Sequence, residues 1–192
     1  MYRIYETEAV ILSASPSAEF GRAYTLLTPE LGIVVARAEG VRKSASKFRY
    51  TLQTLSTLSL SLVRGKGFYR IVHAEPRSSY RRLLSGAVGA LPLAARVAWL
   101  LRRMVGEGET NPKLFAVTKE FLTLLSTTPR ESLPLLEIAT VMRILSLLGY
   151  FPERSEYADM FEGPLAPALP LVGALREHLI KDINEALSAS HL

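Results

Sequence analysis

The fold is decided by residues 57 to 72, which read Thr57-Leu-Ser-Leu-Ser-Leu-Val-Arg-Gly-Lys-Gly-Phe-Tyr-Arg-Ile-Val72. In the first half leucines alternate with small polar residues, and this period of two is typical of a strand with one buried and one wet face. Gly65 and Gly67 tolerate positive φ, so the chain is expected to reverse there and to return along Phe68 to Val72. The stretch therefore predicts an antiparallel β-hairpin.

Upstream of the hairpin, three further segments have the composition of strands: Thr7 to Leu12, Ala23 to Thr28 and Ile33 to Glu39. Pro29 and Gly32 are well placed to turn the chain between the last two. About five short strands with glycine-containing turns and no helical period favour a five-stranded barrel of the oligonucleotide-binding (OB) type. An open five-stranded sheet is the alternative.

After Pro76 the apolar period changes from 2 to 3.6, which predicts helices from about Ser78 or Ser79 onward. We therefore expect an α+β protein with two domains, an OB-fold domain over residues 1–78 and an all-α helical domain over residues 79–192. Asn111 and Pro112 are typical of a helix start. Three prolines between Gly163 and Pro170 predict a connecting loop, and the leucines that follow predict one last helix.

Charge is distributed unevenly along the chain. Residues 1 to 82 carry 13 Lys and Arg against 6 Glu, a net charge of +7, whereas residues 83 to 192 carry 10 cations against 12 acids, a net charge of −2. An asymmetry of this kind indicates that a basic N-terminal module meets a polyanion. The simpler alternative is a soluble basic face without a ligand.

A nucleic acid is the polyanion that best matches Arg and Lys interleaved with aromatic residues, because its phosphates release counterions when they bind the cations and its bases stack on the rings. Phe48, Tyr50 and Phe68 could provide stacking faces. Taken singly, each cation is explained as well by solubility, so the hypothesis rests on the cluster. The candidate nucleic-acid-binding residues are Arg37, Arg42, Lys43, Lys47, Arg49, Arg64, Lys66 and Arg70.

The composition argues against several classes of enzyme and of site. The chain has no cysteine, three histidines and only two aspartates, so it offers no disulfide, no thiolate metal site and little for a catalytic triad. Gly65-Lys66-Gly67 lacks the frame of a phosphate-binding loop. The longest run without a charge is far too short for a membrane span, and no export peptide is readable. We expect a cytoplasmic binding protein without a cofactor.

Six short motifs occur in the order and spacing of one bacterial family. They are Tyr5-Glu-Thr-Glu-Ala-Val-Ile-Leu12, Leu26-Leu-Thr-Pro-Glu-Leu-Gly32, Ala38-Glu-Gly-Val-Arg-Lys43, Leu62-Val-Arg-Gly-Lys-Gly67, Glu107-Gly-Glu-Thr-Asn-Pro-Lys-Leu-Phe115 and Arg143-Ile-Leu-Ser-Leu-Leu-Gly-Tyr-Phe-Pro152. Over about residues 5 to 152 the chain resembles the RecO family of bacterial DNA repair proteins.

The resemblance implies an N-terminal OB barrel, a C-terminal helical domain and a recombination mediator that is not an enzyme. Members of the family bind single- and double-stranded DNA and anneal complementary strands. They also contact the single-stranded DNA-binding protein SSB and, with RecR, help to load RecA. The resemblance further implies a cytoplasmic, nucleoid-associated protein.

One departure from the family lies after the motif that ends at Pro152. Many relatives carry a four-cysteine zinc site there, whereas this chain has no cysteine, so zinc is not expected. Packing by Tyr157, Met160, Phe161 and Leu165 could replace the metal, or the prolines could leave the loop mobile. The chain end also looks short, so no residue is assigned to the SSB contact.

Two other functions remain open at this level. An RNA-binding or ribosome-associated factor could use the same barrel and charge. A protein-only adaptor could have the same fold and bind no nucleic acid.

Overall fold

The structure is a computed structural model that describes residues 3–17, 21–39, 41, 48–84, 86–152 and 154–190. By its internal contacts the chain divides into two compact units. The first comprises Met1–Leu83 with Val105–Phe115, and the second comprises Leu84–Met104 with Ala116–Leu192. The boundary between an OB-fold domain and a helical domain at residues 78 and 79 stays a prediction.

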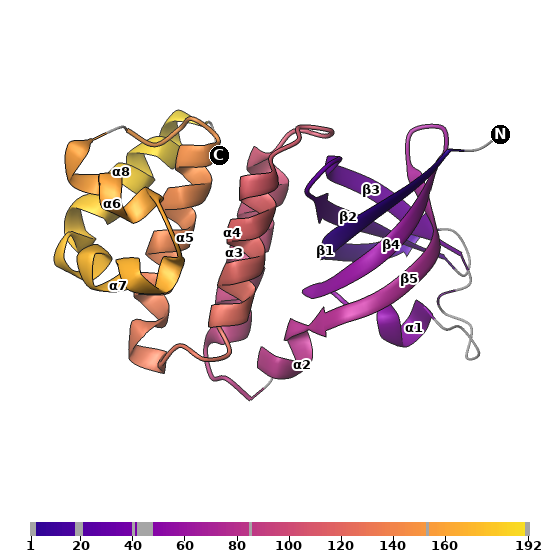
Figure 1. Ribbon diagram of the computed structural model, residues 1–192, viewed down its shortest axis with the longest axis horizontal. Coiled ribbons are helices and arrows are strands. Elements are labelled where there is room, and N and C mark those ends of the chain that lie inside the picture. Colours follow the sequence, from indigo (N-terminus) through magenta and orange to yellow (C-terminus); the bar gives the residue numbers. More distant parts are fainter. Residues whose placement is uncertain are drawn as a thin grey trace. The chain divides into compact units, whose positions relative to one another are not determined.

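The first unit is a closed five-stranded barrel with the strand order β1-β2-β3-β5-β4 (Figure 1). The strands are β1 (Ile4–Ser17), β2 (Gly21–Thr28), β3 (Gly32–Ala38), β4 (Ser56–Arg64) and β5 (Tyr69–Ser79). Short helices α1 (Phe48–Thr51) and α2 (Tyr80–Leu84) precede β4 and follow β5. The α+β class with an OB-fold barrel is confirmed, and the open sheet is excluded.

Strand β1 closes the barrel because it is long enough to pair on both sides. Its first half pairs with β4, from Ile4 opposite Val63 onward, and its second half pairs with β2 as far as Ser17 opposite Gly21. The register shifts between Ile11 and Ser13, an irregularity of the kind that bends a strand. A single bent strand thereby pairs with both β2 and β4 and closes the barrel.

The predicted hairpin is confirmed. β4 and β5 pair antiparallel, and the Gly65 amide donates to the Phe68 carbonyl at 2.8 Å across the turn. Leu58, Leu60 and Leu62 are at most 1% exposed and belong to the barrel core. The expectation that the opposite face of β4 is exposed to solvent was wrong, because the polar residues between these leucines are also buried or half-buried.

Residues 105–115 pack against the barrel unit at the β2–β3 turn. The Gly108 amide donates to the Ile33 carbonyl at 3.1 Å, and Ile33 forms a parallel bridge with Glu107. Gly32 has a φ of 66°, and a Cβ atom built there would collide with the Glu109 carbonyl oxygen. Gly32 therefore both allows the turn and lets this segment approach the backbone closely.

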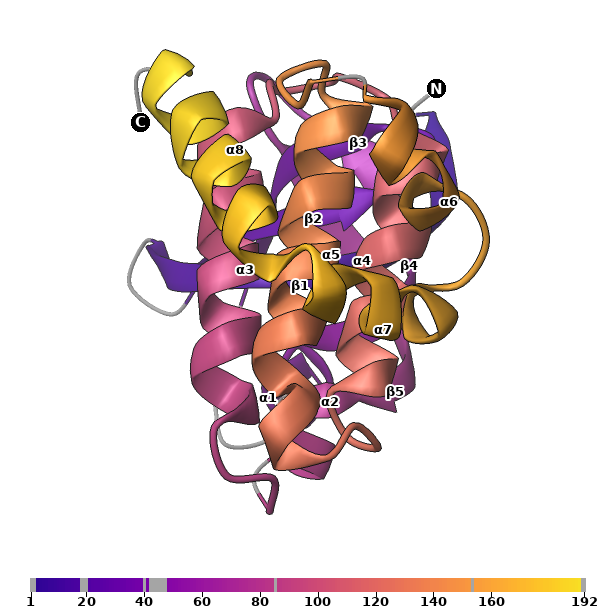
Figure 2. The same cartoon turned by 90° about the vertical axis from the view of Figure 1, so that its left-hand side faces the viewer.

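The second unit is helical and is organised around α5 (Leu133–Leu147), which α7 and α8 cross in Figure 2. The other elements are α3 (Ala90–Met104), α4 (Pro112–Leu124), η1 (Arg130–Ser132), η2 (Ser155–Tyr157), α6 (Ala158–Phe161), α7 (Leu165–Ala174) and α8 (Arg176–Ala189). Among the described residues, every helix is too short or too polar to pass through a lipid bilayer.

The expectation of a loop between Gly163 and Pro170 was wrong, because α7 begins at Leu165. Pro164 precedes the helix and Pro167 lies in its first turn, where backbone amides have no intrahelical acceptor, so neither interrupts its hydrogen bonds. Pro170 lies inside α7, which ends soon afterwards at Ala174. The predicted last helix is thus split into α7 and α8 at Leu175.

Arg143 organises the segment in which many relatives carry zinc-binding cysteines. Its side chain is buried, and its guanidinium donates to four backbone carbonyls, those of Met160 (2.7 Å), Glu162 (3.1 Å), Gly163 (2.6 Å) and Pro164 (3.2 Å). Burial lowers the pKa of Arg143, and the nearby Glu120 carboxylate opposes that shift. One side chain from α5 therefore fixes the turn between α6 and α7.

Apolar packing completes this segment, as one of the two sequence alternatives proposed. Tyr157, Met160 and Leu165 are at most 1% exposed. The Tyr157 hydroxyl donates to the Asp182 Oδ2 atom of α8 at 2.9 Å, while Arg154 binds the other oxygen at 3.1 Å. The segment is therefore held by a buried polar network as well as by its core.

Candidate nucleic-acid interface

The structure brings four of the eight candidate residues to one region of the barrel, where β3 meets β5 and the β4–β5 turn begins. Arg37 lies on β3, Arg64 ends β4, Lys66 lies in the turn and Arg70 lies on β5. All four are exposed. We call this group, together with Phe68, the basic seam. Arg42, Lys43 and Lys47 lie outside the described residues.

Arg49 does not join the basic seam. It lies on α1, which is near the end of β5 that leads to α2, whereas the β4–β5 turn is at the other end of β5 (Figure 1). Arg49 is exposed beside Tyr50, with its guanidinium carbon 5.8 Å from the ring centroid. Any contribution of Arg49 to a ligand must therefore come from a different part of the barrel surface.

The pairing of β3 with β5 explains why Arg37 and Arg70 are neighbours. The two strands are parallel and pair over only two positions, Ala36 with Tyr69 and Arg37 with Arg70. Ala36 is buried in the barrel, so the next position on each strand faces outward. Two arginines distant in sequence are thereby placed side by side on the outer surface.

Arg37 also covers the aromatic ring next to the turn. Its guanidinium carbon lies 4.0 Å from the centroid of the Phe68 ring, within the range of a cation–π contact. Of the three aromatic candidates, Phe48 packs against the barrel core and Tyr50 is 77% exposed. Phe68 therefore orients a cation, and Tyr50 is the more open stacking surface.

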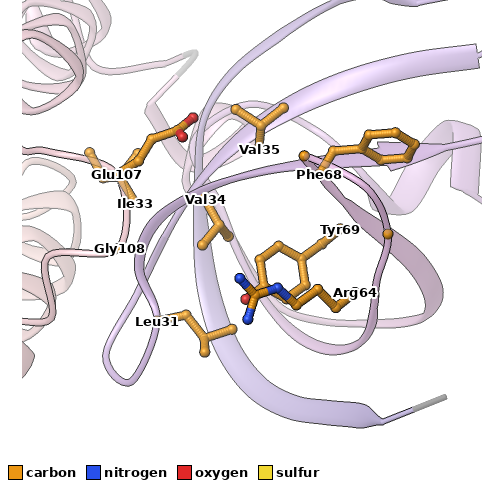
Figure 3. A pocket seen from close by; sticks show the side chains of 11 residues that line it. Leu31, Ile33, Val34, Val35, Arg64, Phe68, Tyr69, Glu107 and Gly108 are labelled. Atoms are coloured by element: carbon orange, nitrogen blue, oxygen red, sulfur yellow. The ribbon is translucent and has the colours of Figure 1, made fainter. Parts of the chain in front are cut away.

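Next to the two paired positions, residues of β3 and of the β4–β5 turn line a cavity of about 260 Å³. Figure 3 shows Arg64 and Tyr69 pointing toward Leu31 and Val34, while the Phe68 ring points away from them. Tyr69 is held by an edge-on contact with Tyr5, with ring centroids 5.7 Å apart. The cavity thus combines apolar walls, an aromatic ring, one guanidinium and the Glu107 carboxylate.

The cations of the basic seam have no carboxylate within ion-pair distance in the described part of the chain. Like charges on directly opposed strand residues are destabilising, and Arg37 and Arg70 are such a pair. This arrangement leaves the positive charges available to an anionic ligand. The described residues also contain no group of three or more His, Asp or Glu side chains suited to a metal ion.

Sequence reasoning missed Arg22. It lies on β2 and is exposed, but it pairs with Ala38, which is buried like Ala36, so its side chain starts from the opposite face of the sheet to that of Arg37 and does not join the basic seam. Burial raises the pKa of Tyr24, and the charge of Arg22 opposes that shift. Counting outward from the turn between Thr28 and Gly32 places Arg22 opposite residue 38, so the hairpin register was the signal that could have identified it.

Comparison with known proteins matches both units of the chain. The family model described as "Recombination protein O N terminal" matches residues 1–80, and the model described as "Recombination protein O C terminal" matches residues 89–162. All six motifs of the family resemblance lie within these two ranges.

Individual relatives agree with the family models. The DNA repair protein RecO of Heliobacterium modesticaldum is 33% identical over 180 residues, which cover 90% of this chain and 64% of the relative. The RecO proteins of Pelotomaculum thermopropionicum and Dehalococcoides mccartyi are each 29% identical, with 90% and 84% of this chain and 67% and 63% of the relatives covered. The chain thus spans about two thirds of these relatives, and with both family models matched in order it belongs to the RecO family of DNA repair proteins.

Proposed function

We propose that this chain is a DNA-binding recombination mediator that acts in DNA repair and is not an enzyme. In this proposal the barrel binds single- and double-stranded DNA and brings complementary strands together. With RecR, the protein helps to load RecA on DNA coated with SSB. The work needs no bond to be made or broken, because neutralising two phosphate backbones lowers their mutual repulsion.

The observation that carries the proposal is the basic seam on an OB barrel in a member of the RecO family. OB barrels bind oligonucleotides with the face of strands 2 and 3 and with the loops that join strands 1 to 2 and 4 to 5. Arg37 lies on β3, and Lys66 lies in the β4–β5 turn. Two of the four cations thus occupy positions that OB barrels commonly use for a strand, which supports the proposal.

The cavity beside the basic seam favours a single strand over a closed duplex as the ligand of this region. It is lined by the Tyr69 ring and the Arg64 guanidinium, and both groups can stack on a base that is free of its partner. A base within a duplex is stacked and paired and cannot enter such a site without being extruded. Duplex DNA would then contact mainly the outer cations Arg37 and Arg70.

The first test measures the affinity for a fluorescent oligothymidine as a function of salt. The variant Arg37→Ala/Arg70→Ala removes two phosphate contacts, so the slope of log affinity against log salt should fall in magnitude by about 1.4. Arg77→Ala is the matched control, because Arg77 is also an exposed arginine on β5 but lies outside the basic seam. An equal effect of the control would refute this location of the site.

The second test addresses mediation. Two complementary oligonucleotides coated with SSB are mixed with the protein, and pairing is followed by fluorescence at low salt. We expect faster pairing with the parent protein and slower pairing with Arg37→Ala/Arg70→Ala. Failure of the parent protein to accelerate pairing would contradict the annealing activity, even if DNA binding is intact.

A competition experiment separates the proposal from its two rivals. The labelled oligothymidine is displaced with unlabelled single-stranded DNA or with structured RNA of equal length. Stronger displacement by the RNA would support an RNA-binding factor. If the protein binds neither nucleic acid at low salt, the adaptor remains and the proposal fails.

A further inference from the structure

Helix α3 carries an exposed aromatic and cationic surface that the barrel site does not use. Trp99 is 54% exposed and is the only tryptophan of the chain. Arg102 and Arg103 follow one turn later and are exposed, and the Arg103 guanidinium carbon lies 5.8 Å from the Trp99 ring centroid. We call these three side chains the α3 face; α3 is the helix to the left of α5 in Figure 2.

The charge of α3 has one sign. The helix contains three arginines and neither aspartate nor glutamate. Arg96 is paired with Glu137 of α5 through two contacts of 2.6 and 2.8 Å. Over the residues that the structure describes, Arg102 and Arg103 have no carboxylate within ion-pair distance. Two cations of the α3 face are therefore available to an external anion.

Helix physics explains only part of this arrangement. Cations in the last turn of a helix interact favourably with its dipole, which accounts for Arg102 and Arg103. It does not account for a large exposed indole within reach of them. A single strand of nucleic acid requires both features together, because its phosphates need cations and its unpaired bases need an aromatic face.

We propose that the α3 face is a second binding site for single-stranded nucleic acid. One base stacks on the Trp99 indole, and Arg102 and Arg103 neutralise the flanking phosphates. Residues at positions i, i+3 and i+4 of a helix are neighbours on its surface, so one short stretch of strand can reach all three. The inference extends the proposed function, because an annealing protein must hold two strands, but it can be tested without annealing.

The single tryptophan makes the α3 face directly observable. In the free protein, acrylamide should quench Trp99 emission readily, because the ring is exposed. Oligothymidine should quench the emission through base stacking and should protect the ring from acrylamide. An abasic oligonucleotide of equal length carries the same charge without bases, so it should bind with little quenching. Equal quenching by the abasic chain would overturn the stacking contact.

Variants test the role of the two arginines. Arg102→Ala/Arg103→Ala should raise the oligothymidine concentration at half quenching roughly tenfold at low salt, because two phosphate contacts are lost. Arg130→Ala/Arg176→Ala is the matched control, since it removes two exposed arginines elsewhere in the helical unit. A change of the same size in the control would show a non-specific charge effect and would overturn the proposal.

A last variant separates this proposal from the barrel site. In the Arg37→Ala/Arg70→Ala background, oligothymidine should still quench Trp99, and adding Trp99→Ala should weaken binding of a labelled oligonucleotide about fivefold or more. Loss of annealing with persistent quenching would count against the proposed function alone. Absence of quenching in the parent protein, or an indole shielded from acrylamide, would overturn the α3 site alone.

Discussion

The barrel and the helical unit use arginine in opposite ways. In the barrel, Arg37 and Arg70 lie side by side on the surface without a carboxylate partner among the described residues. In the helical unit, Arg143 is buried against four backbone carbonyls, and Arg154 binds the buried carboxylate of Asp182. The comparison teaches that a binding surface is marked by exposed cations without a protein partner, rather than by the number of cations in a region.

The energetic reason is desolvation. A buried guanidinium loses its hydration and stabilises the fold only where its donors find acceptors, so its removal leaves those acceptors unsatisfied. An exposed guanidinium keeps its hydration and contributes little to folding, but it can release counterions when a polyanion binds. The two units should therefore respond differently when an arginine is removed.

The largest effect should come from Arg143→Met. Methionine preserves much of the packing volume but removes the donors to the turn between α6 and α7, so we expect the free energy of unfolding to fall by about 3–5 kcal/mol. Denaturation with urea, followed by Trp99 emission, measures it. Arg130→Met, on the exposed η1 segment, should change stability by less than about 0.5 kcal/mol. A loss below 1 kcal/mol for Arg143→Met would mean that the turn does not depend on this side chain.

A second large effect is expected in the barrel, where the backbone rather than a charge is critical. Gly32→Ala combines the cost of a positive φ with a collision against the Glu109 carbonyl, so we expect a loss of about 2–4 kcal/mol. Gly67→Ala is the matched control, because Gly67 has a φ of 77° but open space around its Cβ position. It should cost only about 1–2 kcal/mol. Equal losses would show that the approach of residues 105–115 contributes nothing.

Local sequence patterns were sufficient for part of the fold. The alternation in residues 57 to 62 and the glycines of the following turn identified the hairpin, because both effects act between near neighbours. The start of α4 was readable for the same reason, and the Leu114 amide indeed lies 3.1 Å from the Asn111 side-chain oxygen. Helix α7 was missed because Pro164 and Pro167 occupy positions that need no amide donor, so only Pro170 interrupts its backbone hydrogen bonds.

The candidate site was less accessible to sequence reasoning. The adjacency of Arg37 and Arg70 depends on parallel pairing of β3 with β5, which no local pattern specifies. The same closure separates Arg49 from the basic seam, although both were placed in one cluster by charge alone. The α3 face was overlooked because Trp99 and its arginines lie in the half of the chain with a net negative charge.

A moderate effect is expected for Tyr157→Phe. The substitution leaves the buried Asp182 carboxylate without one donor, so stability at neutral pH should fall by about 1–3 kcal/mol. Tyr150→Phe, at a half-exposed ring, is the control and should leave stability nearly unchanged. If both variants behave alike, the hydrogen bond to Asp182 does not stabilise the helical unit.

The same tyrosine should make stability dependent on alkaline pH. Burial and the hydrogen bond to Asp182 raise the pKa of Tyr157 to about 12, whereas the unfolded chain ionises near pKa 10. The tyrosine contribution is therefore complete below about pH 10 and is lost as the pH rises toward 12. Parent protein minus Tyr157→Phe, measured by urea denaturation across this range, isolates the effect. A difference that stays constant would contradict the raised pKa.

The smallest effect on folding should accompany one of the larger effects on binding. Arg70→Ala removes an exposed cation that faces Arg37 across the β3–β5 pair, so stability should change by no more than about 0.5 kcal/mol. Any change should make the variant slightly more stable than the parent protein, because like charges on opposed strand residues repel each other. Urea denaturation and oligothymidine binding, measured on one preparation, provide the comparison. A clear loss of stability would place Arg70 with Arg143 as a structural arginine and would remove the contrast on which the basic seam rests.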